Sequence, residues 1–126
     1  MRIVKNFFNT VRGTAAIEFA VVLPVFLLFI FGSIEFGYLL WADSTLKYGA
    51  NYGARYAFVH PTASSTEIEN FALSTTSFSG SVITYVVTKA PLFVDIDGSL
   101  TYNFVVIPLS PITLTVQQHQ LLPLPS

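Results

Sequence analysis

One acidic residue stands where an acid is costly, at the start of a long apolar stretch. Glu18 precedes Phe19 and a run without charge that continues to Ile34. A carboxylate at the edge of such a run is destabilising unless it is neutralised or paired. Cleavage of the peptide bond after Gly13 would supply a partner, because Thr14 would then carry a free α-amino group, largely protonated at neutral pH. The spacing predicts that the Glu18 carboxylate of one subunit pairs with the Thr14 ammonium of a neighbour and so sets the register of parallel helices.

Three acidic or helix-breaking positions in this region have more than one interpretation. Glu18 could instead be an interfacial acid near the cytoplasmic headgroups, bound to no partner. Pro24 can kink a helix, or it can be a purely structural residue, because proline is common in membrane helices. Glu35 lies ~32 Å along a helix from Thr14 at ~1.5 Å per residue, so we expect its carboxylate to snorkel to water at the outer surface. The alternative for Glu35 is a contact with a partner subunit.

The apolar stretch is long enough to cross a bilayer. Residues 15–41 provide about 27 residues, or ~40 Å of helix, whereas the hydrocarbon core needs only about 20 residues. Tyr38 and Trp41 lie at its far end, where aromatic rings prefer the headgroup level. The basic residues that precede it are Arg2, Lys5 and Arg12. The positive-inside rule therefore predicts a cytoplasmic N-terminus and an outer domain beyond Trp41.

The composition agrees with a membrane segment and excludes several classes of protein. Hydrophobic residues make up 52% of the 126 residues and charged residues only 10%, an imbalance that soluble domains rarely show. The formal net charge of −1 gives no electrostatic basis for binding nucleic acid. Cysteine is absent, which excludes disulfide bonds and thiolate metal sites.

The residues around Gly13 resemble a known processing signal. Gly13 followed by TAAIEF resembles the class III signal of type IV pilin-like proteins, which a prepilin peptidase reads on the cytoplasmic face. The longer stretch RGTAAIEFAVVLPVFLLFIFGSIEFG resembles the N-terminus of TadE-like proteins of the tight-adherence (Flp) pilus system. Positions that recur in that family fall on Gly13, Glu18-Phe19, Pro24 and Gly32/Glu35/Gly37.

This resemblance implies a minor pilin or pseudopilin in the bacterial inner membrane, single-pass, with a cytoplasmic N-terminus. The C-terminal domain would lie in the periplasm, or outside the cell in a pilus. Its partners would be the lipid bilayer, other pilin and minor pilin subunits, the prepilin peptidase and the Tad assembly platform. It would act in priming, tip formation or incorporation during pilus assembly for surface adherence, without a cofactor and not as an enzyme.

Helical periodicity continues beyond the membrane segment. Residues 42–59 place small side chains on one face, including Gly49, Ala50, Gly53 and Ala54. Glycine costs a free-standing helix about 1 kcal/mol relative to alanine, so two glycines on one face predict the close approach of another backbone. That backbone could belong to a partner helix or to the protein's own sheet. By resemblance, the stretch also matches the Ala/Gly/Arg-rich segment of TadE-like proteins.

The remaining chain predicts a short helix and a small sheet. His60-Pro61 ends the long helix, and Ser64 with Glu67 fits a capping box for a second helix at about 66–75. A turn-rich linker is expected at residues 77–81. Strands are expected at 82–88, at 92–96 and 99–106 around a hairpin turn at Asp97-Gly98, and at 112–117.

A sheet this small needs a partner layer. We therefore predict a membrane-anchored α+β fold that is pilin-like, with a long N-terminal helix, a short second helix and a small antiparallel sheet. Its parts would be a basic leader at 1–13 that is removed, a transmembrane helix at 14–41, an outer continuation of the helix at 42–59, and a small α+β periplasmic domain at 60–126.

No motif for catalysis or metal binding is present in the sequence. His60 and His119 have no second ligand at metal-binding spacing, so we predict no metal site. Asp95-x-Asp97-Gly98 begins like a calcium loop, but Val106 stands at the twelfth position, where glutamate is required. No nucleophile motif or glycine-rich phosphate loop is found.

Two other functions are open. The first is a membrane-anchored periplasmic scaffold or binding module that is not cleaved at Gly13. The second is a secreted soluble domain released near Ser44, although a signal peptide has an apolar region of only about 7–15 residues. The mature N-terminus and retention in the membrane distinguish these functions.

Overall fold

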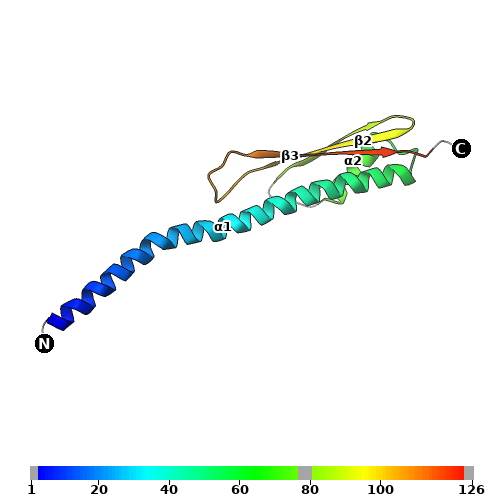
Figure 1. Cartoon of the computed structure of the whole chain (residues 1–126). Coiled ribbons are helices and arrows are strands. Elements are labelled where there is room, and N and C mark those ends of the chain that lie inside the picture. Colours follow the sequence, from blue (N-terminus) through cyan, green and yellow to red (C-terminus); the bar gives the residue numbers. More distant parts are fainter. Residues whose placement is uncertain (1–2, 77–80, 124–126) are drawn as a thin grey trace.

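The computed structural model describes the backbone of residues 3–76 and 81–123, with side chains from Gly13 onward. Figure 1 shows α2 and the sheet beside the C-terminal half of the long helix α1, while the N-terminal half projects alone. The predicted α+β arrangement is confirmed. The elements are α1 (Ile3–Val59), α2 (Ser65–Ser74), β1 (Ile83–Lys89), β2 (Phe93–Tyr102) and β3 (Ile112–Leu121).

The helix α1 runs for 57 residues without interruption. Figure 1 shows that it bends within its N-terminal half, which contains Pro24. Proline removes one backbone hydrogen bond and is a common cause of such bends. The helix ends at Val59, as expected from the proline at position 61, which disfavours helical geometry in the residue before it.

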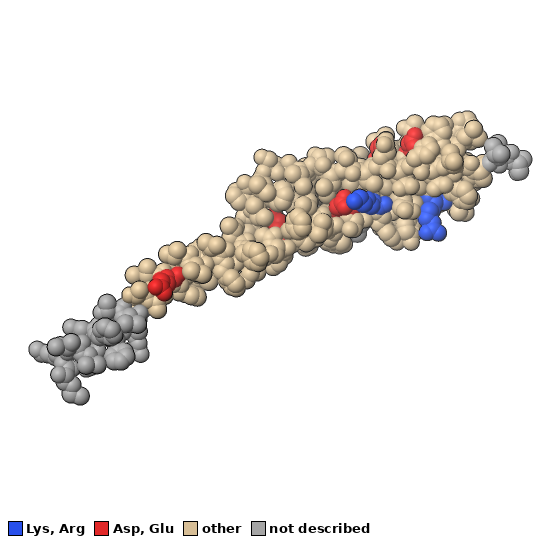
Figure 2. All heavy atoms as spheres, in the orientation of Figure 1, with Lys and Arg blue, Asp and Glu red and all other residues tan. Residues whose placement is uncertain are grey.

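The N-terminal half of α1 presents apolar side chains outward. From Gly13 to Phe31 the side chains are exposed, except for the partly buried Leu23. By length and composition, α1 is the helix among the described residues that could cross a membrane, with a mean hydropathy of 2.5 in its most apolar window. Figure 2 shows this surface in tan. It begins at the acidic atoms next to the grey residues and ends near the charged side chains by the sheet.

The sheet is antiparallel in the order β1-β2-β3. The central strand, β2, is buried at every second position. Val94, Ile96 and Leu100 of β2 are buried, and their alternation with more exposed residues gives the sheet one core face and one outer face. The outer edge of β1 is partly covered by α2, because the Glu69 carboxylate accepts a hydrogen bond from the Val87 N–H at 3.0 Å.

The predicted second helix and its capping box are confirmed. The Ser64 hydroxyl accepts from the Glu67 N–H at 3.3 Å, and the Glu67 carboxylate accepts from the Ser64 N–H at 2.7 Å. The hydrogen bond from the Ser64 backbone, and then that from its hydroxyl, lower the pKa of Glu67. Of the linker expected at residues 77–81, positions 77–80 lie outside the described residues.

The predicted hairpin turn at Asp97-Gly98 is wrong. The strand β2 continues through both residues, and Gly98 pairs with Tyr85 on one side and Val116 on the other. A side-chain carbon at Gly98 would lie 2.8 Å from atoms of each of these neighbours. The glycine therefore provides space for two large cross-strand neighbours in the middle of a strand. The actual connections between strands are residues 90–92 and 103–111.

The small-residue face of the outer half of α1 is buried inside the chain, against α2 and the sheet. At Gly53 a side-chain carbon would lie 3.0 Å from Ile96 and 3.1 Å from Ala72. Beside Gly49 the Tyr85 hydroxyl donates a hydrogen bond to the Leu46 carbonyl at 2.9 Å. Burial raises the pKa of Tyr85 to about 12. The buried residues of the face are Ala42, Leu46, Gly49, Ala50, Gly53, Ala54 and Ala57.

We predict that Gly49→Ala destabilises the domain formed by the C-terminal half of α1, α2 and the sheet. The added methyl group would overlap the Tyr85 hydroxyl and the Thr76 methyl, and moving the hydroxyl breaks its buried bond to the Leu46 carbonyl. Overpacking of this kind costs about 1–3 kcal/mol, which exceeds the gain of about 1 kcal/mol in helix propensity. Thermal unfolding of the full chain in detergent, followed by circular dichroism, measures the change.

Gly37→Ala is the matched control, because nothing lies within 4 Å of the position that its methyl group would occupy. It should leave the unfolding temperature unchanged or raise it. In a Tyr85→Phe background the penalty of Gly49→Ala should become smaller, because the overlapping hydroxyl is gone. Equal stability of Gly49→Ala and the parent chain would contradict the close approach seen here.

Candidate functional site

The proposed processing site lies within α1. Gly13 and Thr14 are helical and exposed, and no atom lies within 4 Å of the position that a side-chain carbon at Gly13 would take. The side chains of the basic residues Arg2, Lys5 and Arg12 lie outside the described part of the chain.

Glu18 and Phe19 lie just over one helical turn beyond Gly13 and Thr14, the proposed processing site. Thr14 and Glu18 are four positions apart and so share a helix face. The Glu18 side chain is exposed and Phe19 is 64% exposed. Within the described side chains Glu18 forms no ion pair. The carboxylate is thus presented outward, as pairing with a second subunit requires, and that pairing remains a prediction.

The expectation that Glu35 snorkels to water is wrong. Its side chain points into the chain and is only 6% exposed. The carboxylate accepts hydrogen bonds from three successive backbone N–H groups in the connection between β2 and β3. One oxygen accepts from Val105 and, at 3.2 Å, from Val106, and the other accepts at 2.9 Å from Ile107. A buried carboxylate needs such donors, and here the chain supplies them itself.

This contact also explains why the predicted strand at 99–106 stops early. Successive N–H groups of a β-strand point in opposite directions, whereas those of residues 105–107 converge on one carboxylate. The backbone must therefore leave the strand conformation, and β2 ends at Tyr102. The Tyr102 hydroxyl donates to the Glu35 backbone carbonyl at 3.4 Å, and burial, followed by the nearby Glu35 charge, raises the pKa of Tyr102.

A glycine allows the connection to lie against the helix below Glu35. The Ile107 side chain reaches to 3.5 Å from the position that a side-chain carbon at Gly32 would take. Gly37, the other glycine of the predicted Gly32/Glu35/Gly37 group, faces open space. Of this group, Gly32 and Glu35 therefore contact the β2–β3 connection, and Gly37 does not.

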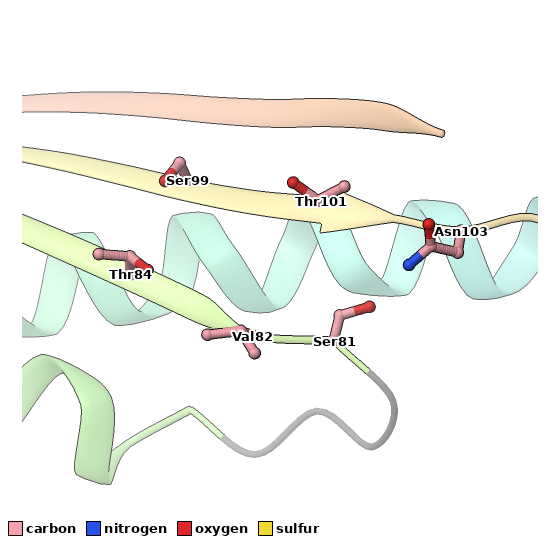
Figure 3. Close-up of a pocket in the computed structure, with 6 residues that line it drawn as sticks. All are labelled: Ser81, Val82, Thr84, Ser99, Thr101 and Asn103. Atoms are coloured by element: carbon pink, nitrogen blue, oxygen red, sulfur yellow. The ribbon is translucent and has the colours of Figure 1, made fainter. Parts of the chain in front are cut away.

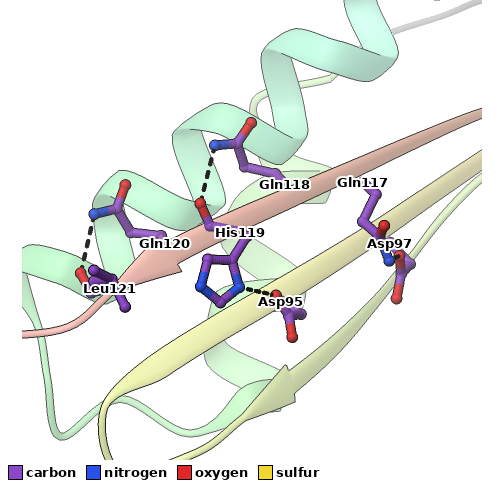
Figure 4. Close-up of polar contacts among 7 residues, drawn as sticks. All are labelled: Asp95, Asp97, Gln117, Gln118, His119, Gln120 and Leu121. Carbon is purple, nitrogen blue, oxygen red and sulfur yellow. Dashed lines mark hydrogen bonds and ion pairs between the residues drawn. The ribbon is translucent and has the colours of Figure 1, made fainter.

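The outer face of the sheet carries polar pairs. Figure 4 shows the His119 ring beside Asp95 and Gln117 beside Asp97. His119 Nδ1 lies 2.5 Å from an Asp95 carboxylate oxygen, and the Gln117 amide donates to Asp97 at 3.0 Å. These are cross-strand pairs between β2 and β3. Across the described residues no group of three histidine or acidic side chains could hold a metal ion.

A shallow groove lies between β1 and β2 on the same outer face. Figure 3 shows its lining of small polar side chains around Val82. Hydroxyl and amide groups dominate, and no titratable side chain lines it, so the groove has no group for acid–base chemistry. Its lining residues are Ser81, Val82, Thr84, Ser99, Thr101 and Asn103.

The role of Glu35 is the main feature that the sequence did not reveal. The sequence does show an acid at the end of an apolar run, which implies a partner. The partners are backbone N–H groups, however, and every residue except proline carries one. No residue type therefore marks residues 105–107 as the donors.

We predict that Glu35→Gln releases the β2–β3 connection. Glutamine has the same size as glutamate but only one acceptor oxygen. Its NH2 group would face the backbone N–H groups of residues 105–107. Losing hydrogen bonds to a charged group costs about 1.5–3 kcal/mol, so the amides of residues 105–107 should exchange with solvent about tenfold faster or more. Hydrogen exchange of the full chain in detergent measures this.

Glu69→Gln provides a matched control, since that carboxylate accepts a backbone N–H from Val87 on the edge strand. Its effect should stay near β1. If Glu35→Gln leaves exchange at residues 105–107 unchanged, the carboxylate does not hold the connection.

One protein family matches part of the chain. Residues 13–55 match the family described as TadE-like protein, a span that contains Gly13, Glu18, Glu35 and most of the small-residue face. No curated protein and no solved structure matches the chain. A domain of this family implies a protein associated with the Tad pilus, and the family is generally non-enzymatic. Residues 13–55 of this chain, which lie within α1, form a TadE-like domain.

Proposed function

We propose that the chain is a minor pilin or pseudopilin of a Tad pilus. Its residues 14–41 anchor it in the bacterial inner membrane with residues 42–126 on the outer side, until cleavage after Gly13 allows assembly. It then takes part in priming, tip formation or incorporation of subunits. Its partners are the bilayer, the prepilin peptidase, the Tad assembly platform and other pilin subunits.

The observation that carries this proposal is the exposed apolar half of α1 with a single acid near its base. Val25 and Phe29 are 68% and 74% exposed, and no other element of the described chain covers this half. Burying such side chains is worth about 1.5–3 kcal/mol each. Lipid can cover them before assembly, and the helices of other subunits can cover them afterwards.

The proposed mechanism of assembly is association between parallel helices. Apolar contacts give little preference for one axial register, because lipid tails are as apolar as the side chains. An ion pair between Glu18 and the new Thr14 ammonium of a neighbour would fix the register, since a shift of one turn leaves a charge unpaired in apolar surroundings. Cleavage thus creates the partner that Glu18 lacks.

We expect the mature chain to begin at Thr14 in cells with an active prepilin peptidase and at Met1 in cells without it. Intact mass and N-terminal sequencing of the membrane fraction make this measurement. Start at Met1 in both strains would indicate an uncleaved membrane-anchored scaffold or binding module. Start near Ser44, with release from the membrane, would indicate a secreted domain.

A pair of glycine variants tests recognition of the site separately from folding. Gly13→Leu should block cleavage, because a bulky side chain would replace the small residue at the scissile bond. Gly37→Leu should be processed normally. Both positions face open space, so neither change should disturb the fold, and equal processing of the two variants would exclude Gly13 as the cleavage position.

We also predict that Glu18→Ala prevents incorporation into pili while leaving membrane insertion and cleavage intact. Removing one partner of a buried pair costs about 3–5 kcal/mol, so the amount in sheared pili should fall by more than about tenfold. Ile17→Ala is the control, because Ile17 is adjacent, 68% exposed and uncharged. Normal incorporation of Glu18→Ala would refute the pairing mechanism but not the membrane anchor.

A further inference from the structure

The connection between β2 and β3 exposes apolar side chains at one end of the sheet. Residues 103–111 contain no charged residue, and none follows Asp97 in the sequence. Val105 is 89% exposed, Leu109 57% and Val106 42%. Apolar side chains that gather on one exposed loop are typical of a surface that contacts a protein or a membrane.

The connection is fixed to α1 and lies along it. The Glu35 carboxylate holds residues 105–107 by their N–H groups, and Ile107 packs at Gly32. Figure 1 shows this orange segment extending from the sheet along α1 toward its N-terminal half. Its exposed side chains therefore have a defined level along the helix.

That level corresponds to the outer boundary of a membrane. Glu18 and Glu35 bracket the apolar stretch and are 17 positions apart, ~26 Å along the helix, compared with ~30 Å for the hydrocarbon core. Gly32 lies inside this interval. If Glu18 stands at the inner boundary, Ile107 lies at the depth of the outer leaflet and the rest of the connection lies close beside it.

Four N–H groups of the connection are satisfied within the chain. Irregular backbone at membrane depth is tolerated only where its polar groups are satisfied within the protein. The Glu35 carboxylate satisfies three of the N–H groups, the Leu109 N–H donates to the Ile107 carbonyl at 2.7 Å, and proline at positions 108 and 111 has no N–H to satisfy.

From this geometry we propose that the β2–β3 connection is a second membrane contact, in which Val105, Val106 and Leu109 insert among the lipids of the outer leaflet. The inference rests on the proposed membrane anchor of α1. Lipid is favoured as the occupant because the exposed side chains continue the apolar surface of α1 at the same level and carry no charge. The contact would fix how far the sheet stands from the bilayer and how it is rotated about α1.

Tryptophan fluorescence can test this contact. The chain has a single tryptophan, so Trp41→Phe gives a background without one. In it, Leu109→Trp and Val105→Trp report from the connection in the full chain reconstituted in phosphatidylcholine vesicles. We expect blue-shifted emission, and loss of most of that emission when the acyl chains carry bromine near the headgroup.

Two further variants of the same background serve as controls. Phe26→Trp lies in the membrane half of α1 and should be quenched by bromine placed deep in the acyl chain, whereas Val86→Trp on the outer face of β1 should not be quenched. The exposed fractions of Phe26, Val86 and Leu109 are 55%, 56% and 57%. Differences among the three variants therefore reflect membrane depth.

The outcomes separate this inference from the proposed anchor. Quenching of both loop variants and of Phe26→Trp, but not of Val86→Trp, supports the inference. Quenching of Phe26→Trp alone overturns it and leaves the anchor intact. Blue-shifted loop emission that bromine does not quench shows that a second protein copy covers the connection, which also overturns it. Absence of quenching at Phe26→Trp removes the anchor and the inference together.

Discussion

Close approach between the sheet and the C-terminal half of α1 is the constraint on which the packing of this half, α2 and the sheet depends. Gly49 and Gly53 leave space for Tyr85, Ile96 and the neighbouring side chains of α2, so both layers can pack on one helix. A three-stranded sheet has too little apolar surface to be stable alone. The helix provides its second layer, and the buried hydrogen bond from Tyr85 to the Leu46 carbonyl, 2.9 Å long, fixes where the sheet lies along it. Larger residues at the two glycines would separate the layers.

The surface of α1 changes along its length, from exposed and apolar to partly buried against the sheet, and the change occurs at Gly32 and Glu35. From Phe19 to Phe31 the side chains of α1 are apolar and, except for Leu23, exposed, and above this level one face is buried in the domain. A carboxylate at such a boundary is costly if it faces lipid. Here it is turned inward and accepts three backbone N–H groups, so that a group unsuited to the membrane becomes the attachment of the β2–β3 connection.

The sequence predicted features that depend on local chemistry and misassigned those that depend on distant neighbours. The end of α1, the Ser64 capping box and the alternation of the strands follow from residues close in the chain, and all are found. Asp97-Gly98 has the composition of a turn, but the cross-strand neighbours of Gly98 decide its role. Glu35 was misassigned because its donors lie about seventy positions away and are backbone groups, which no residue type identifies. For the small-residue face, periodicity identified the buried residues but could not decide between a partner helix and the protein's own sheet.

Glu18 and Glu35 therefore have opposite positions, and this difference bears on the proposed assembly. The hydrogen-bonding capacity of Glu35 is used within the chain, so a neighbouring subunit would have to break existing bonds to engage it. Glu18 is exposed on a surface that no other described element covers, and a neighbour can engage it without disturbing the fold. A register between parallel subunits requires a polar group that is unsatisfied in the monomer and satisfied in the assembly. Of these two acids, only Glu18 meets that requirement, which is why the proposed mechanism depends on it and on the ammonium group that cleavage at Thr14 would create.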